Sequence, residues 1–222
     1  MDHKPRTPFP VAGYFGPDYF CDRQKELKQL ITNIRGGHST TLTSLRRLGK
    51  TALIHHLFHH LGSRYMTIYM DILATESLAD FLNRFSTSLA AKYSERTHIG
   101  KKLWKLILSL RPVISYDPLS GNPLISIQSS PNEIKKTMGE LLAILDGQPK
   151  PVVIAIDEFQ QILEYPEKRT DAWLRTLVQE LKNTSFIFSG SQQHLMRDLF
   201  SNPERPFFRS TQFMKIGKLA AD

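Results

Sequence analysis

The chain has 222 residues, of which 41% are hydrophobic, and 29 lysines and arginines against 21 aspartates and glutamates give it a net charge of +8. This length suffices for one large domain with a sizeable core, or for one domain with a small appendage. A single cysteine, Cys21, excludes an internal disulfide and makes a reduced, cytoplasmic location the expectation. Neither a long apolar run nor a signal-peptide core is present, so we expect no membrane span. The basic balance favours anionic partners, although a domain with spare lysines explains it equally well.

Helix-like and strand-like segments alternate after an N-terminal arm, residues 1–21, which is rich in proline, glycine and aromatic residues. Apolar residues at helical spacing predict helices over residues 22–35, 51–62, 76–93, 99–110, 131–146, 169–182 and 192–200. Short apolar runs predict strands over residues 40–45, 65–72, 151–159, 185–191 and 213–219. Asp22 is the expected N-cap of the first helix, and Gly36-Gly37 its expected end.

The alternation of strands and helices predicts an α/β fold, a three-layer α/β/α sandwich with a mostly parallel sheet. Its strands are apolar throughout, as is typical of a sheet that is covered on both faces. Residues 111–128 contain two apolar stretches around a turn and predict a β-hairpin, inserted within the region of about 95–150. In such sheets ligands bind at the carboxyl ends of the strands, where the candidate residues lie.

The octapeptide SLRRLGKT, residues 44–51, differs by one residue from a phosphate-binding loop. Gly49, Lys50 and Thr51 are in place, while Ser44 replaces the first glycine of the motif. In such a loop, backbone N–H groups and Lys50 bind the phosphates and Thr51 binds Mg²⁺. Ser44 is compatible with this function if its φ is negative. A basic strand–helix turn without a nucleotide is the alternative.

The strand PVVIAIDEF, residues 151–159, ends in two acidic residues. Asp157 is the candidate for coordinating Mg²⁺, and Glu158 for polarising the water that attacks the nucleotide. An acidic turn after a core strand is common and is the alternative. Because both motifs occur in one chain, each at a strand end, a nucleotide site is the favoured interpretation.

Two further residues are candidates for the catalytic site. Ser191, at the end of SFIFSGS, could contact the γ-phosphate or the attacking water, or it could simply be the N-cap of the following helix. Arg209, in RPFFRS, could act as an arginine finger across an interface between two copies, or it could be a surface arginine.

Together these residues resemble P-loop ATPases of the AAA+/STAND kind, and more narrowly the prokaryotic, archaeal-type AAA-ATPase-like domain family. The resemblance lies in PDYFCDRQKELKQL, SLRRLGKTALI, VVIAIDEFQQI, FIFSGSQQHLM and RPFFRSTQFMKIGKL. It implies a P-loop NTPase sheet of order 5-1-4-3-2, ATP and Mg²⁺ as ligands, and hydrolysis. The nucleotide contacts that it implies come from Arg46, Arg47 and Ala52 in the loop, and from Tyr19 and Phe20 near the adenine.

The chain departs from this family at two places. Cys21-Asp22-Arg23 stands where the family has Gly-Arg-Glu, and Ser44 replaces a glycine. The family also usually continues into a helical lid and a partner-recognition domain, and this chain stops at about the point where the lid would begin. We therefore expect a fragment, whose core spans residues 22–222.

The leading functional hypothesis is an ATP hydrolase that acts as a switch or motor core for a partner protein or DNA, with ATP and ADP as ligands and a homo-oligomer left open. One alternative is a nucleotide-gated scaffold that does not hydrolyse ATP. Another is a nucleic-acid-binding module with a vestigial loop, which the net charge of +8 motivates. The lysines of KKLWKLILSL could contact a membrane or a nucleic acid, but an amphipathic helix that packs on the protein is the favoured interpretation of that segment.

Overall fold

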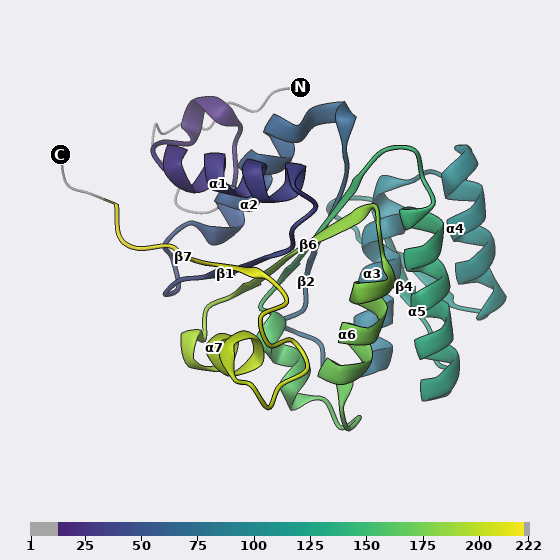
Figure 1. Ribbon diagram of the computed structural model, residues 1–222. Helices are drawn as coiled ribbons and strands as arrows, with labels where there is room; N and C mark the ends of the chain where they lie inside the picture. Colours follow the sequence, from purple (N-terminus) through teal and green to yellow (C-terminus); the bar gives the residue numbers. More distant parts are fainter. Residues whose placement is uncertain (1–12, 220–222) are drawn as a thin grey trace.

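A computed structural model describes residues 13–219, and it has a five-stranded sheet at its centre (Figure 1). The strands are β1 (Thr40–Thr43), β2 (Met66–Asp71), β5 (Val152–Asp157), β6 (Thr184–Gly190) and β7 (Gln212–Lys215). They lie in the order β2-β5-β6-β1-β7, and every neighbouring pair is parallel. Numbered as five core strands and read from the β7 edge, this is the order 5-1-4-3-2, so the predicted topology is confirmed.

Helices cover both faces of this sheet, which confirms the three-layer sandwich. The α-helices are α1 (Gln24–Arg35), α2 (Lys50–Leu61), α3 (Leu78–Lys92), α4 (His98–Ser109), α5 (Pro131–Asp146), α6 (Thr170–Glu180) and α7 (Gln193–Ser201). Three short 3₁₀ helices are η1 (Pro17–Tyr19), η2 (Gly62–Arg64) and η3 (Phe159–Glu164). Apolar residues of α1 and α2 form one core on the sheet, and those of the other helices form a second core on the opposite face.

Strand β5 shows why the apolar residues of a central strand follow one another without alternating with polar residues. Val153 and Ala155 belong to the core under α1 and α2, whereas Val152, Ile154 and Ile156 belong to the opposite core. Successive side chains of a strand point to opposite faces, so a strand between two cores must be apolar at every position. Asp157 ends this strand at its carboxyl end, where the chain can reach a ligand.

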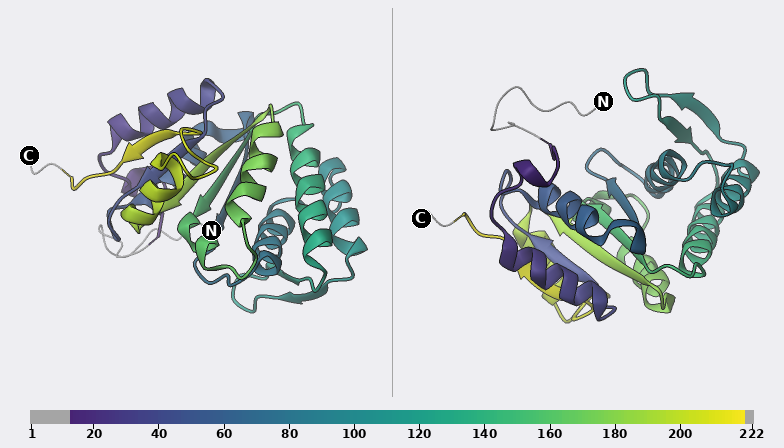
Figure 2. Two further views of the ribbon diagram at one scale, coloured as in Figure 1. Left: turned by 60° about the horizontal axis from the view of Figure 1, so that its bottom comes forward. Right: turned by 90° about the horizontal axis from the view of Figure 1, so that it is seen from above.

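The predicted hairpin is present as β3 (Val113–Tyr116) and β4 (Pro123–Ser126), an antiparallel pair outside the central sheet. With α4 and α5 it lies on the side of the molecule away from β7 (Figure 2). The backbone N–H groups of Ile125 and Ile127 donate to Thr87 Oγ1 and Asn83 Oδ1 of α3, at 3.0 and 2.7 Å. The insertion is thus attached through α3 rather than through the sheet.

Strand β2 forms the edge of the sheet that faces the insertion. Lys92, at the end of α3, donates from Nζ to the carbonyl and hydroxyl oxygens of Thr67. Arg84, also on α3, donates from Nε to the carbonyl oxygen of Asp71 at 2.9 Å. Two outward carbonyls of the edge strand are therefore occupied by cationic side chains.

Several element boundaries differ from expectation by a few residues. The predicted strand 151–159 ends at Asp157, and Phe159 already belongs to η3. Asp22 does not cap α1, because the helix begins at Gln24 and Asp22 and Arg23 both adopt positive φ, 60° and 61°. The last strand ends at Lys215 rather than at residue 219. Of the expected arm, residues 1–12 lie outside the described residues. Within residues 13–219, no helix is both long and apolar enough to cross a membrane.

Candidate functional site

The loop of residues 44–49 joins β1 to α2 in the geometry that an anion site requires. Gly49 has φ +84° and immediately precedes Lys50, the first residue of α2. No side chain caps the N-terminus of α2, so its first N–H groups remain directed toward the loop. Lys50 is only 6% exposed, and its charge is held at the base of the loop.

Ser44 fits the first position of the loop. It is fully buried and does not belong to the residues with positive φ, so a serine adopts this backbone without strain. Its hydroxyl donates to the carbonyl oxygen of Leu45 at 2.8 Å and accepts from Lys50 Nζ at 3.3 Å. The condition set for this substitution is therefore met, and the serine interacts with the lysine of the motif.

The two residues predicted to hold Mg²⁺ are in contact, although 106 positions separate them along the chain. Thr51 Oγ1 donates to Asp157 Oδ2 at 2.7 Å. Tyr69, on the neighbouring strand β2, donates its hydroxyl to the same oxygen at 3.0 Å. The backbone N–H of Glu158 donates to the other oxygen, Oδ1, at 3.1 Å. Asp157 is thus fixed by three donors at the edge of the loop.

Sequence reasoning missed Tyr69. In the strand register it lies opposite Ala155, two residues before Asp157 on the adjacent strand. A hydroxyl-bearing aromatic residue within a strand is a signal, but it becomes specific only when the strand order is known. Burial, and then the charges of Asp157 and Asp71, raise the pKa of the Tyr69 hydroxyl, so it stays a protonated donor.

Glu158 and Ser191 are brought together at the ends of β5 and β6. Ser191 donates to Glu158 Oε2 from its hydroxyl at 2.7 Å and from its backbone N–H at 3.2 Å. Gln160 donates to the same oxygen from Nε2 at 2.7 Å. Ser191 is not the N-cap of α7, because Gln192 holds that position without a side-chain capping bond. The capping alternative for Ser191 is therefore wrong.

A cavity of about 860 Å³ joins most of the predicted residues around the loop. It is lined by Gly13, Tyr14, Arg46, Arg47, Gly49, Lys50, Thr51, Ala52, His55 and Glu158. Three cationic side chains and one carboxylate face this space, which suits a polyanionic ligand next to a proton acceptor. His55 was not singled out for this place by the sequence.

The N-terminal arm packs against α2 beside the loop. The ring of Phe20 stacks on His56 with centroids 4.0 Å apart, and the Tyr14 hydroxyl is hydrogen-bonded to His56 Nδ1 at 2.9 Å. A smaller cavity of about 350 Å³ is lined by Phe20, Cys21, Arg23, Arg47, Leu48, Gly49, Lys218 and Leu219. Tyr19 lines neither of these two cavities.

Arg23 connects three parts of the chain beside this smaller cavity. It donates to Glu26 Oε1 at 2.8 Å, to the carbonyl oxygen of Leu48 at 3.4 Å and to that of Gly217 at 2.6 Å. Because Asp22 has a positive φ, it occupies a position that favours glycine. Arg23 has a positive φ as well, so the chain turns sharply through both residues before α1 begins.

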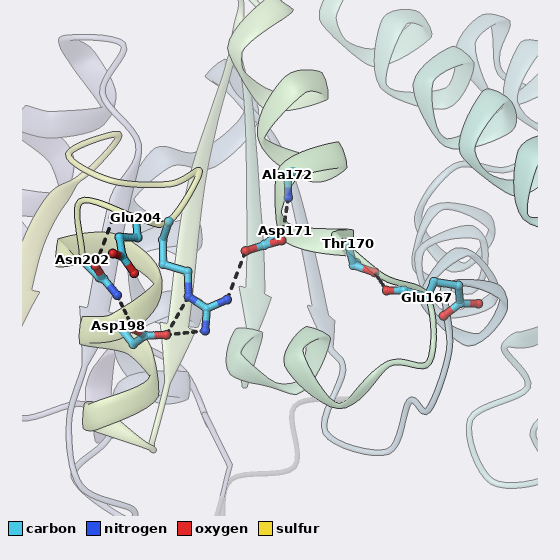
Figure 3. A network of polar contacts seen from close by, with 8 residues as sticks. Glu167, Thr170, Asp171, Ala172, Asp198, Asn202 and Glu204 are labelled. Atoms are coloured by element: carbon cyan, nitrogen blue, oxygen red, sulfur yellow. Dashed lines mark hydrogen bonds and ion pairs between the residues drawn. The ribbon is translucent and has the colours of Figure 1, made fainter.

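Arg209 lies apart from both cavities, on the segment before β7. It is exposed, has φ 50°, and its guanidinium lies 5.1 Å from the ring centre of Phe208. The nearby Arg205 is engaged in the network of Figure 3, where it contacts Asp198 Oδ2 at 2.5 and 2.7 Å and Asp171 Oδ2 at 3.5 Å. Hydrogen bonds from Asn202 and then Arg205 lower the pKa of Asp198. Arg205 thus joins α6 to α7, whereas Arg209 is available at the surface.

The chain matches known proteins at the level of a domain family. A family described as an ATPase domain predominantly from Archaea matches residues 20–206. The fold is similar to a Walker-type ATPase of Pyrococcus abyssi, with a TM-score of 0.62, 17% identity, and coverage of 95% of this chain and 57% of that chain. It is also similar to the Aeropyrum pernix ORC1 protein, solved in complex with DNA, with a TM-score of 0.57, 17% identity, and coverage of 92% and 47%.

A third structure, the Aeropyrum pernix ORC2 protein in ADPNP-ADP complexes, has a TM-score of 0.58, 13% identity, and coverage of 96% of this chain and 52% of that chain. The chain therefore spans about half the length of the solved structures it matches. No curated protein matches the sequence. At these identities the structural likeness establishes the fold alone.

Proposed function

The chain belongs to this family of ATPase domains found predominantly in Archaea, and we propose that it binds ATP with Mg²⁺ and hydrolyses it. The observation that carries the proposal is the contact of Thr51 with Asp157 beside the buried Lys50, at the uncapped start of α2. We further propose that it works in the cytoplasm as a switch or motor core, whose nucleotide state changes its association with a partner.

The oxygen groups of Thr51 and Asp157 fit Mg²⁺, a hard cation that binds through oxygen. When bound, the ion would neutralise charge on the β- and γ-phosphates. The chain's own residues supply the rest of the phosphate site. Backbone N–H groups of the loop and of the first turn of α2, up to Ala52, cradle the phosphates, and Lys50 neutralises them.

Arg46 and Arg47 lie exposed on the loop and line the larger cavity, where they add positive charge at its rim. Glu158 is the proposed general base, since its side chain lines the same cavity. Ser191, which contacts Glu158, is proposed to act beside the attacking water or the γ-phosphate.

The smaller cavity is the proposed adenine site. Phe20 contributes an aromatic ring to its lining, and Leu48 and Gly49 of the loop line it as well. An apolar pocket with a few polar groups is typical of sites for a nucleobase. Tyr19 remains a prediction of the family resemblance, supported here only by its place next to Phe20.

The direct test combines thermal melting with turnover. ATP with Mg²⁺ is expected to raise the melting temperature of the wild-type chain, because a ligand that binds only the folded state stabilises it. Glu158→Gln is expected to keep this shift while its turnover falls by about 10²- to 10⁴-fold. Lys50→Ala is expected to lose both, because its charge serves ground-state binding and the transition state alike.

The outcomes separate the hypotheses. A melting shift without turnover in the wild-type chain favours a nucleotide-gated scaffold. No shift with either ATP or ADP contradicts the nucleotide site and leaves the nucleic-acid-binding module. Unchanged turnover in Glu158→Gln removes Glu158 from the role of general base.

Nucleic acid is the partner that one observation favours. Residues 96–116, which include α4 and the first strand of the hairpin, contain five cationic residues and no acidic residue. All five side chains, Arg96, Lys101, Lys102, Lys105 and Arg111, are exposed, and none belongs to an ion pair among the described residues. Phosphate backbones bind such surfaces without sequence preference. A protein partner, or a second copy that receives Arg209 as an arginine finger, is the other proposal.

A further inference from the structure

The carboxylate of Glu158 is held asymmetrically. Oε2 accepts three hydrogen bonds, from the hydroxyl and the N–H of Ser191 and from Nε2 of Gln160, at 2.7, 3.2 and 2.7 Å. Within the described part of the chain, Oε1 accepts none. Because Glu158 also lines the cavity at the phosphate loop, one oxygen is anchored in the protein and the other is left for a ligand.

Gln160 is itself locked in place. It is 1% exposed, and its carbonyl oxygen has no hydrogen-bond partner among the described residues. That oxygen faces Gly190, where an added Cβ would overlap it and would lie 2.6 Å from Met196 Sδ. The large majority of buried polar side-chain atoms have at least one hydrogen-bond partner, so the unpaired oxygen of this glutamine calls for an explanation. Its one bond, from Nε2 to Glu158, is the only polar contact that the amide makes there.

The backbone between the two residues is shaped for this contact. Glu158 adopts φ 55° and ψ 42°, a left-handed conformation that is unfavourable for glutamate, and η3 starts directly after it. This turn brings the side chain of Gln160 back to that of Glu158, two residues earlier. Such strain persists only where the surrounding structure enforces it, and it is concentrated at functional sites.

We propose that Gln160 is a positioning residue, which together with Ser191 anchors Oε2 of Glu158 so that Oε1 takes the proton of the attacking water. The inference rests on the proposed ATP hydrolysis. In that step the water oxygen bonds to the γ-phosphorus, its proton passes to Oε1, and the bond from phosphorus to the bridging oxygen of ADP breaks. An anchored carboxylate loses little freedom on reaching this geometry, which is how positioning raises a rate.

The test uses Gln160→Met, which keeps length and burial but removes the donor. Gln161→Met is the matched control, because the Gln161 side chain also donates one hydrogen bond, to the carbonyl oxygen of Thr75 at 3.1 Å. Gln161 contacts Glu158 through its backbone N–H, which the substitution keeps, and its side chain donates no hydrogen bond to the Glu158 carboxylate among the described residues. We expect kcat for ATP to fall about 10- to 100-fold in Gln160→Met with KM within about twofold, and the control to keep wild-type values. A merely structural role would change both variants alike or raise KM.

A double-mutant cycle with Glu158→Gln, measured in single turnovers, decides whether Gln160 acts through Glu158. If it does, Gln160→Met causes no further loss in the Glu158→Gln background. Independent, multiplying losses overturn the inference, as does full activity of Gln160→Met. If the wild-type protein shows no turnover, the proposed ATP hydrolysis itself is contradicted, and this result is distinguishable from a failure of the role of Gln160. If Gln160→Met does not fold, Gln160→Ala removes the same donor without adding volume, and the same outcomes apply.

Discussion

Asp157 is held in position by hydroxyl groups from two different elements, Thr51 on α2 and Tyr69 on β2. Thr51 belongs to the phosphate-binding motif, but Tyr69 does not. Burial and the neighbouring carboxylates keep the Tyr69 hydroxyl protonated, so it can only donate to Asp157 at neutral pH. Tyr69 therefore supports the residue that is proposed to bind Mg²⁺, although Tyr69 is not among the residues that line the larger cavity.

Tyr69→Phe should weaken the binding of Mg²⁺ at the proposed site, because it removes this support of Asp157. Removing one donor to a buried carboxylate costs about 1–3 kcal/mol and frees Asp157 to turn. We expect the Mg²⁺ concentration for half-maximal ATP turnover to rise about three- to tenfold. Tyr65→Phe is the control, since Tyr65 packs in the same core next to β2. Equal effects of both substitutions on Mg²⁺ dependence would falsify the role of Tyr69.

The candidate site could be predicted only where its residues are contiguous in the sequence. Gly49-Lys50-Thr51 and Asp157-Glu158 are diagnostic because their chemistry and spacing occur within single segments. The sequence alone does not reveal the contacts of Arg23, Tyr69 and Gln160. The first two residues have partners that are remote in the sequence, and the partner of Gln160 is reached through a turn. Their roles depend on the strand order and on one left-handed turn, and a local sequence pattern predicts neither of these.

At the scale of elements, the arm and α2 meet through His56. Its ring is stacked on Phe20 and hydrogen-bonded to Tyr14, and it is almost completely buried. Burial, and then the nearby His60 and His59, lower the pKa of His56. The folded state thus binds this proton less readily than the unfolded state, so folding favours the neutral ring.

The stability from this contact should be present above about pH 6.5, the unperturbed pKa of histidine, and should be lost as the pH falls toward the folded value. In melting experiments between pH 7.5 and 5.5, His56→Phe, which retains an aromatic ring, is expected to lose less stability than the wild type. His194→Phe, at an exposed position of α7, serves as the control. A wild-type loss that persists in His56→Phe would show that another group is responsible.

Most elements could be predicted because their periodicity reflects the two cores. The continuous apolar strand β5 and the amphipathic α3 follow directly from burial on two faces and on one face. The start of α1 could not be predicted from Asp22, because a left-handed pair of residues replaces side-chain capping there. The hairpin was predicted as an element, but its attachment to Thr87 and Asn83 depends on tertiary packing.

For the molecule as a whole, the candidate nucleotide site and the cationic segment of residues 96–116 lie in different parts of the chain. The candidate nucleotide site lies at the loop and the strand ends, while residues 96–116, one part of the insertion, hold five cationic residues and no acidic residue. Each phosphate contact releases condensed counterions, so binding to duplex DNA through this surface should weaken steeply with salt. The proposed nucleotide site and the proposed polyanion surface share no residue, so substitutions can test the two proposals separately.

Lys101→Glu with Lys105→Glu should reduce affinity for duplex DNA and lower the slope of log K against log salt by about 2. Lys25→Glu with Lys28→Glu on α1, which changes the net charge equally at exposed positions, is the control. Binding measured from about 50 to 200 mM salt distinguishes the two pairs. Equal losses in both would indicate attraction by net charge alone, with no role for the insertion surface.

The occupied carbonyls of β2 also bear on how the protein behaves in solution. A parallel sheet ends in rows of backbone groups that can recruit a strand from another molecule, which leads to aggregation. On this edge the acceptors of Thr67 and Asp71 are already taken by Lys92 and Arg84. The same two cations repel an approaching chain of like charge. We therefore expect the β2 edge of the sheet to resist intermolecular β-pairing at high protein concentration.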